Sequence, residues 1–170
     1  SLFILTLFGI LIAHLGVIVF NDYFDGKDGT DEANTEYFQQ VSGGSRAIEL
    51  GLISLTGTRN LAIILTLIAL AIGSYIFTHV DPNNKDGVWQ ILLSGLFLGY
   101  FYTARPLRLV ARRGLGEIAI FLAFGPLLTL GTGFAIFNGD FVNSDHFFNC
   151  ILMGIPMGLL TTNILLINEF

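Results

Sequence analysis

Five long apolar stretches constrain this chain more than any other feature of its sequence. They run from Leu2 to about Phe20, from about Leu61 to Val80, from about Val88 to Tyr102, from about Leu115 to Phe137 and from about Phe147 to Ile167. An α-helix needs about 20 apolar residues to cross the hydrocarbon core of a bilayer. We therefore predict an all-α protein that folds as a polytopic transmembrane helical bundle.

The composition agrees with a membrane protein and excludes three other classes. Only 12% of the 170 residues are charged and 53% are hydrophobic, whereas an ordinary soluble domain has about 25% charged residues. A soluble globular enzyme is therefore excluded, and so is a disordered chain, which needs low hydrophobicity and high charge. A disulfide scaffold is excluded as well, because Cys150 has no second cysteine in the chain.

Two of the predicted spans contain a proline, and one span is short. Pro126 and Pro156 each remove a backbone hydrogen bond, so we expect both helices to kink against a packed neighbour or a cavity. The third stretch, from about Val88 to Tyr102, is short for a bilayer unless flanking residues complete it.

The charged residues are segregated between the loops. Seven of the eight basic residues lie before the second span or between the third and the fourth, and the positive-inside rule makes that side cytoplasmic. After five spans, the segment that follows Ile167 returns to the same side. The net charge of -5 argues against nucleic acid as a partner, because phosphate binding requires a basic face.

An acidic motif begins where the first span ends, at Asn21-Asp22-Tyr23-Phe24-Asp25, and it continues to Asp28 and Asp31. If the helix continues, Asn21 and Asp25 share one face and Asp22 lies close to it, so that oxygen ligands converge. Magnesium prefers one or two carboxylates together with substrate phosphates. The same residues, with the turn formers Gly26 and Gly29, are also typical of a solvated acidic loop.

Arginines gather on the same predicted face, in the segment Tyr102-Thr103-Ala104-Arg105-Pro106-Leu107-Arg108 and at Arg112 and Arg113. Guanidinium groups bind phosphate oxygens bidentately. The topology rule alone accounts for Arg112 and Arg113. An acidic cluster and an arginine cluster at the rim of an apolar bundle together favour a site for a magnesium-bound phosphate that carries a lipid-soluble tail.

With these motifs in order, and with Ser42-Gly43-Gly44-Ser45-Arg46 between them, the sequence resembles the UbiA-type intramembrane prenyltransferases. It is most similar to the 1,4-dihydroxy-2-naphthoate polyprenyltransferase branch of menaquinone synthesis. The resemblance implies a nine-span fold with two aspartate-rich motifs. We expect residues 1–170 to be the N-terminal part of one such domain, truncated at both ends, with about five spans and with Asn168 opening the second motif.

The resemblance also implies roles for individual residues. Metal ligation would fall to Asn21, Asp25, Asp28 and Asp31, the catalytic set would be Asn21, Asp22, Asp25 and Asp31, and the diphosphate would be held by Arg46, Arg105, Arg108 and Asn168. The implied cofactor is Mg2+, and the implied partners are an isoprenyl diphosphate, an aromatic acceptor and membrane lipid. The implied location is a prokaryotic cell membrane, as a multi-pass protein whose active site faces the cytoplasm.

One departure from the branch concerns the first span. The naphthoate branch typically has His followed four residues later by Asn, whereas this chain has His14 and Ile18. His14 is either directed toward the site or structural, and Glu117 either orients Arg113 or the acceptor or simply favours a helix N-terminus.

Two alternatives to the naphthoate branch stay open. One is a related enzyme whose acceptor is 4-hydroxybenzoate, homogentisate or a tetrapyrrole. The other is a transporter fragment with an acidic, cation-binding mouth. A transporter is expected to carry ionisable groups near the midplane of the membrane, and the second and third spans have no Asp, Glu, Lys or Arg.

Overall fold

The computed structural model describes residues 1–28, 47–48, 50–112 and 114–168, and these contain helices and no strand. The elements are α1 (Leu2–Asp28), α3 (Leu55–His79), η1 (Pro82–Asn84), α4 (Lys85–Thr103), η2 (Leu109–Ala111), α5 (Leu115–Leu122), the π-helical segment η3 (Ala123–Leu127), α6 (Leu128–Ile136) and α7 (Asp145–Asn168). Since α5, η3 and α6 follow one another without a loop, they form one bent rod.

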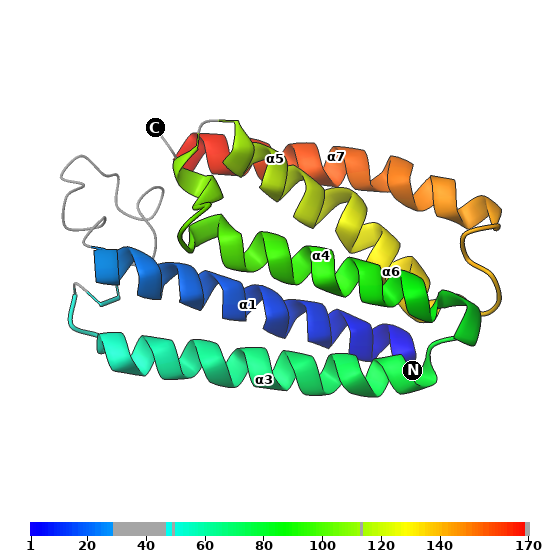
Figure 1. Cartoon of the computed structure of the whole chain (residues 1–170), viewed down its shortest axis with the longest axis horizontal. Helices are drawn as coiled ribbons and strands as arrows, with labels where there is room; N and C mark the ends of the chain where they lie inside the picture. Colours follow the sequence, from blue (N-terminus) through cyan, green and yellow to red (C-terminus); the bar gives the residue numbers. More distant parts are fainter. Residues whose placement is uncertain (29–46, 49, 113, 169–170) are drawn as a thin grey trace.

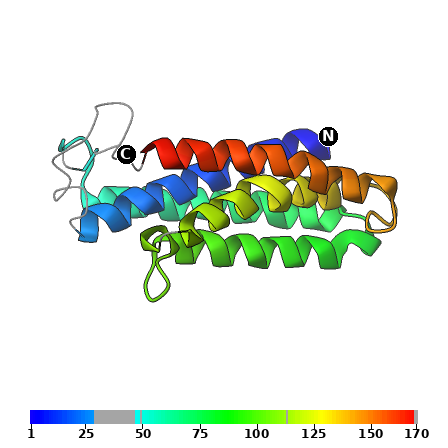
Figure 2. The same cartoon turned by 90° about the horizontal axis from the view of Figure 1, so that it is seen from above.

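Five helical rods lie side by side and alternate in direction (Figure 1). The end of α1, the start of α3, the segment between α4 and α5 and the end of α7 therefore lie at one end of the bundle, which we call the site end. The start of α1 and the connections from α3 to α4 and from α6 to α7 lie at the opposite end, the far end. The view from above shows the same separation (Figure 2).

The rods pack in two groups. One group is α1 with α3, and the other is the bent rod α5–η3–α6 with α7. The remaining helix, α4, contacts the bent rod more than it contacts α1. Helix α1 meets α4 and α6 only sparsely, so a seam runs between the two groups along α1.

The predicted spans are confirmed as helices, with one error in the boundaries. Helix α3 begins at Leu55 and not at about Leu61 as predicted, so Arg59 and Asn60 lie inside it. The physical reason is an N-cap: the Ser54 hydroxyl accepts a hydrogen bond from the Gly57 N–H at 3.1 Å. Four helices of the described part are long and apolar enough to cross a membrane, at Leu2–Lys27, Leu55–His79, Leu115–Ile136 and Asp145–Ile167. Helix α4, which corresponds to the third predicted span, is not among these four: it is the shortest of the five rods, and its first turn carries Lys85 and Asp86.

The two prolines behave differently. Pro126 lies in η3 next to Gly125, whose backbone has non-helical angles of φ -104° and ψ -108°. The rod bends there, as predicted. Pro156, in contrast, lies inside α7, which runs as one helix from Asp145 to Asn168.

Glycines let α7 approach the bend backbone to backbone. A Cβ atom on Gly154 would come within 2.7 Å of the Pro126 nitrogen, and one on Gly158 would come within 2.6 Å of the Phe121 carbonyl oxygen. Gly154 and Gly158 are one helical turn apart, and this small-xxx-small spacing permits close helix packing in membranes. The bend is therefore fixed by a neighbouring helix.

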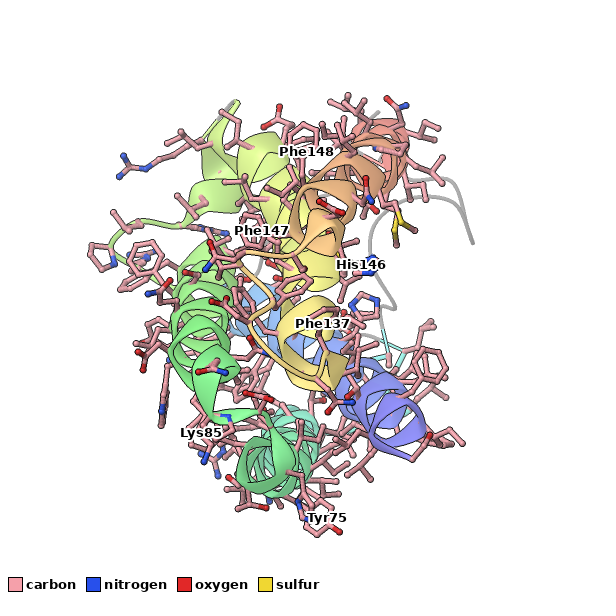
Figure 3. The ribbon with its side chains drawn as sticks, turned by 90° about the vertical axis from the view of Figure 1, so that its right-hand side faces the viewer. Tyr75, Lys85, Phe137, His146, Phe147 and Phe148 are labelled. Atoms are coloured by element: carbon pink, nitrogen blue, oxygen red, sulfur yellow. The ribbon has the colours of Figure 1, made fainter. Side chains whose placement is uncertain are left out.

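A polar clamp closes the far end. Asn84 is completely buried, donates from Nδ2 to the Phe137 carbonyl at 3.0 Å, and accepts at Oδ1 from the Phe141 N–H at 3.0 Å. Asp81 accepts from the Gly139 N–H at 2.8 Å. Phe141 packs against the rings of Phe137 and Phe147. Figure 3 is viewed from this end of the bundle and labels Phe137 and Phe147.

Candidate active site

The acidic motif lies on the last two turns of α1. The helix continues through Asn21, Asp22 and Asp25 to Asp28, as the shared-face prediction required. The side chains of Asn21, Asp22 and Asp25 are half-buried, and both aspartates make interactions within the protein. Spacings of three and four residues bring these oxygen atoms to one side of the helix end.

Thr103 joins this motif to the end of α4. Its hydroxyl donates a hydrogen bond to Asn21 Oδ1, and the Thr103 side chain is buried. The two residues are 82 positions apart in the chain. This bond fixes the orientation of the Asn21 amide and holds the start of the arginine segment beside the acidic motif.

The arginine segment folds back directly after α4. The Ala104 N–H bonds to the Tyr100 carbonyl at 3.0 Å, and the Arg108 N–H bonds to the Ala104 carbonyl at 3.0 Å. Arg108 has a left-handed backbone with φ 41°. Its side chain is half-buried, whereas that of Arg105 is exposed, and both arginines make interactions within the protein.

A cavity of about 310 Å³ lies beside the acidic motif and the start of the arginine segment, with Asn21 and Tyr102 in its lining. It is lined by residues of α1, α4, the bent rod and α7, so it lies on the seam between the two helix groups. Most of the lining is apolar, and its polar members are His14, Asn21, Tyr102 and Thr161. The site therefore combines an apolar chamber among the helices with acidic and basic groups at its mouth.

His14 and Ile18 both line the cavity, one turn apart on α1. The imidazole of His14 meets the ring of Phe124 edge to face, with 5.0 Å between centroids and an interplanar angle of 82°. The sequence left two roles open for His14, and its position in the chamber favours a role in the site.

The structure brings some predicted residues together and does not describe others. Asn21, Asp22 and Asp25 lie at the site end with Arg105 and Arg108, and the backbones of Asp28 and Asn168 lie at helix ends on the same side. Asp31, Arg46 and Arg113 lie outside the described residues, as does the segment from Ser42 to Ser45. Within the described ranges, no three His, Cys, Asp or Glu side chains gather as a metal-binding group.

Sequence reasoning missed several residues of the site. Thr103 and Tyr102 belong to the quoted arginine motif, yet only the arginines were assigned roles. A threonine at the end of an apolar span was the available signal, because a buried hydroxyl needs a partner. Gly95, Gly99 and Phe124 also line the chamber, and nothing in the local sequence distinguishes them from ordinary packing residues.

Comparison with known proteins identifies the family. The family model described as the UbiA prenyltransferase family matches residues 1–170. The chain is 32% identical over 126 residues to 2-carboxy-1,4-naphthoquinone phytyltransferase of Arabidopsis thaliana, a match that covers 74% of this chain and 29% of that protein. It is 28% identical over 152 residues to the protein of the same name from Synechocystis, covering 88% of this chain and 42% of that protein.

The chain thus spans less than half the length of these curated relatives. No solved structure gives a significant match. A helical bundle with an acidic motif, an arginine segment and an apolar chamber agrees with the family match, and we conclude that the chain belongs to the UbiA prenyltransferase family.

Proposed function

We propose that this chain forms the diphosphate end and part of the acceptor chamber of an aromatic prenyltransferase. The reaction is the Mg2+-dependent transfer of a polyprenyl group from an isoprenyl diphosphate to 1,4-dihydroxy-2-naphthoate, in menaquinone biosynthesis. The observation that carries the proposal is the bond between Thr103 and Asn21, because it joins the acidic motif and the arginine segment at the mouth of one apolar chamber.

The described residues fit the metal in their chemistry. Asn21, Asp22 and Asp25 offer one amide oxygen and two carboxylates on adjacent turns, and magnesium uses few protein carboxylates when phosphate oxygens complete its shell. In this proposal Asn21 and Asp25 hold the ion, while Asp22, Asp28 and Asp31 support them. When bound, the ion supplies positive charge that stabilises the departing diphosphate.

The chain's own residues provide the other parts of the chemistry. Arg105, Arg108, Arg46 and Asn168 are proposed to hold diphosphate oxygens, and the permanent charge of the guanidinium groups favours the leaving group as its own charge develops. The apolar walls of the chamber keep water away from the allylic carbon, since water would compete with the aromatic ring for it. A new carbon–carbon bond then forms between that carbon and a ring carbon as the bond to the diphosphate oxygen breaks, and the ring carbon regains aromaticity by losing a proton or, where it carries the carboxylate, CO2.

The naphthoate acceptor rests on two supports. The motif order resembles the naphthoate branch, and both relatives are named as naphthoquinone phytyltransferases. Ile18, where that branch typically has Asn, is the main reason to test 4-hydroxybenzoate, homogentisate and a tetrapyrrole beside it. The family match argues against the transporter alternative.

The proposed location is a cell membrane, with the site end toward the cytoplasm. The described basic residues of this end are Lys27, Arg59, Arg105, Arg108 and Arg112, whereas Lys85 lies at the far end. The positive-inside rule supports this orientation.

The test uses the full-length protein in membranes with a polyprenyl diphosphate and a panel of acceptors, with Mg2+ or with a chelator. Lipid products are identified by mass spectrometry. We expect a prenylated naphthoquinol that requires Mg2+ and is lost in Asp25→Asn. Asp86→Asn, an equivalent change at an exposed position of the far end, is the matched control and should keep full activity.

Each other outcome has a definite meaning. Prenylation of a different acceptor would refute the naphthoate assignment and keep the reaction type. Activity that persists in Asp25→Asn, or in the presence of chelator, would refute the metal assignment. Intact diphosphate with every acceptor would refute the proposed function.

A further inference from the structure

His14 is the one side chain lining the chamber that carries an imidazole, and it lies among mostly apolar neighbours. Within the described part of the chain it makes its ring contact with Phe124, and no hydrogen bond of His14 is found there. An ionisable side chain inside a membrane span is costly and rarely placed without a purpose. Both imidazole nitrogens are therefore candidates for contact with a bound molecule.

The position of His14 along α1 relates it to the mouth of the site. His14, Ile18 and Asn21 follow at intervals of four and three residues and all line the same chamber. At 1.5 Å of rise per residue, His14 lies about 10 Å deeper than Asn21 along the helix axis. A ring bound between these two levels faces the diphosphate end on one side and His14 on the other.

The ring contact with Phe124 limits how the imidazole can turn. The edge-to-face geometry, with 5.0 Å between centroids, is a favourable arrangement of aromatic rings. Phe124 belongs to η3, and the close approach of Gly154 to Pro126 fixes this segment against α7. The imidazole of His14, whose side chain is exposed in this structure, therefore faces a segment of the chamber wall that is itself packed tightly against α7.

We propose that His14 binds the aromatic acceptor, with an imidazole nitrogen accepting a hydrogen bond from a hydroxyl group of the acceptor ring. The inference rests on the proposed function and adds a residue to it. The hydrogen bond orients the ring and raises its electron density, which favours attack on the allylic carbon. Ile18, one turn closer to the mouth, offers an apolar surface for the face of the ring.

The experiment measures steady-state KM for each substrate in the full-length protein in membranes. His14→Phe keeps a planar ring and removes the hydrogen-bond acceptor, whereas His14→Gln keeps an acceptor atom. His79→Phe is the matched control, because His79 lies exposed at the far end. Thermal unfolding of each variant in detergent verifies that it folds.

We expect His14→Phe to raise the acceptor KM about tenfold, the effect of losing one hydrogen bond between neutral groups. The KM of the prenyl diphosphate should stay unchanged, and His14→Gln should restore most of the acceptor affinity. A purely structural role would move both KM values together or leave both unchanged, and either result overturns the inference.

A methylated acceptor gives a second test of the hydrogen bond in the same three proteins. Converting the acceptor hydroxyl to a methyl ether should weaken binding to the wild-type protein and to His14→Gln, and should cause no further loss in His14→Phe. An equal loss in all three proteins would refute the hydrogen bond. If the wild-type protein transfers the prenyl group and these variants respond otherwise, the inference about His14 fails while the proposed function stands.

Discussion

Replacing Asn84 by alanine should destabilise the far end of the bundle by an amount that the structure allows us to estimate. The side chain has 0% exposure, donates to the Phe137 carbonyl and accepts from the Phe141 N–H. Asn84→Ala leaves both backbone groups without this partner, and each unsatisfied buried group costs about 1 to 3 kcal/mol. Water that enters the vacated space would replace part of the loss. We therefore expect about 2 to 4 kcal/mol.

Unfolding of the full-length protein in mixed detergent micelles, titrated with a denaturing detergent and followed by circular dichroism, measures this change. Asn138→Ala is the matched control, because Asn138 is an exposed position in the same loop. We expect the control to change stability by less than about 0.5 kcal/mol. A loss for Asn84→Ala as small as that of the control would refute the view that these two hydrogen bonds hold the loop.

Three further predictions concern the site and the pH dependence. Thr103→Val should lower kcat/KM about threefold to tenfold, because Asn21 loses its hydrogen bond, whereas Thr103→Ser should retain activity in the same transfer assay. Gly95→Leu should lower kcat/KM about tenfold or more, because the new side chain fills the chamber. The protein should keep its stability, since a Cβ atom at Gly95 meets no atom within 4 Å. Gly73→Leu is the control, because Gly73 is equally open but lies on α3. Hydrogen bonds from the Asn83 N–H and the Gly139 N–H lower the pKa of Asp81, so its contribution to stability is present above about pH 4 and is lost as the pH falls through the folded-state pKa. Acid unfolding of Asp81→Asn should therefore depend less on pH than that of the wild type.

The five helices were predictable because apolar length is a local property of the chain. The continuation of α1 through Asn21 and Asp25 was predictable too, since residues three and four positions apart carry their oxygen atoms on one face of a helix. The start of α3 was not predictable from apolar length, because the polar residues Arg59 and Asn60 precede the apolar stretch. The helix begins earlier, at Leu55, where Ser54 provides an N-cap. The clamp around Asn84 was equally hidden, because its partners lie more than 50 residues away along the chain.

The chamber depends on tertiary structure in a way that no local pattern reveals. Gly99 in α4 and His14 in α1 line one space only because the two helix groups leave a seam between them. The motif Tyr102-Thr103-Ala104-Arg105-Pro106 predicted a role for the arginine, yet it is the threonine that donates a hydrogen bond to Asn21. The sequence therefore indicated which polar residues lie at the site end better than it indicated the shape of the chamber.

The seam has a consequence for how this protein responds to its bilayer. A chamber inside a single packed core has a width set by side-chain volumes, whereas this one lies between two groups of helices that meet sparsely along α1. Helices tilt to match their hydrophobic length to the thickness of the surrounding lipid. If the two groups tilt by different amounts, the width of the chamber changes while each group stays intact, and we therefore expect substrate access to depend on lipid chain length.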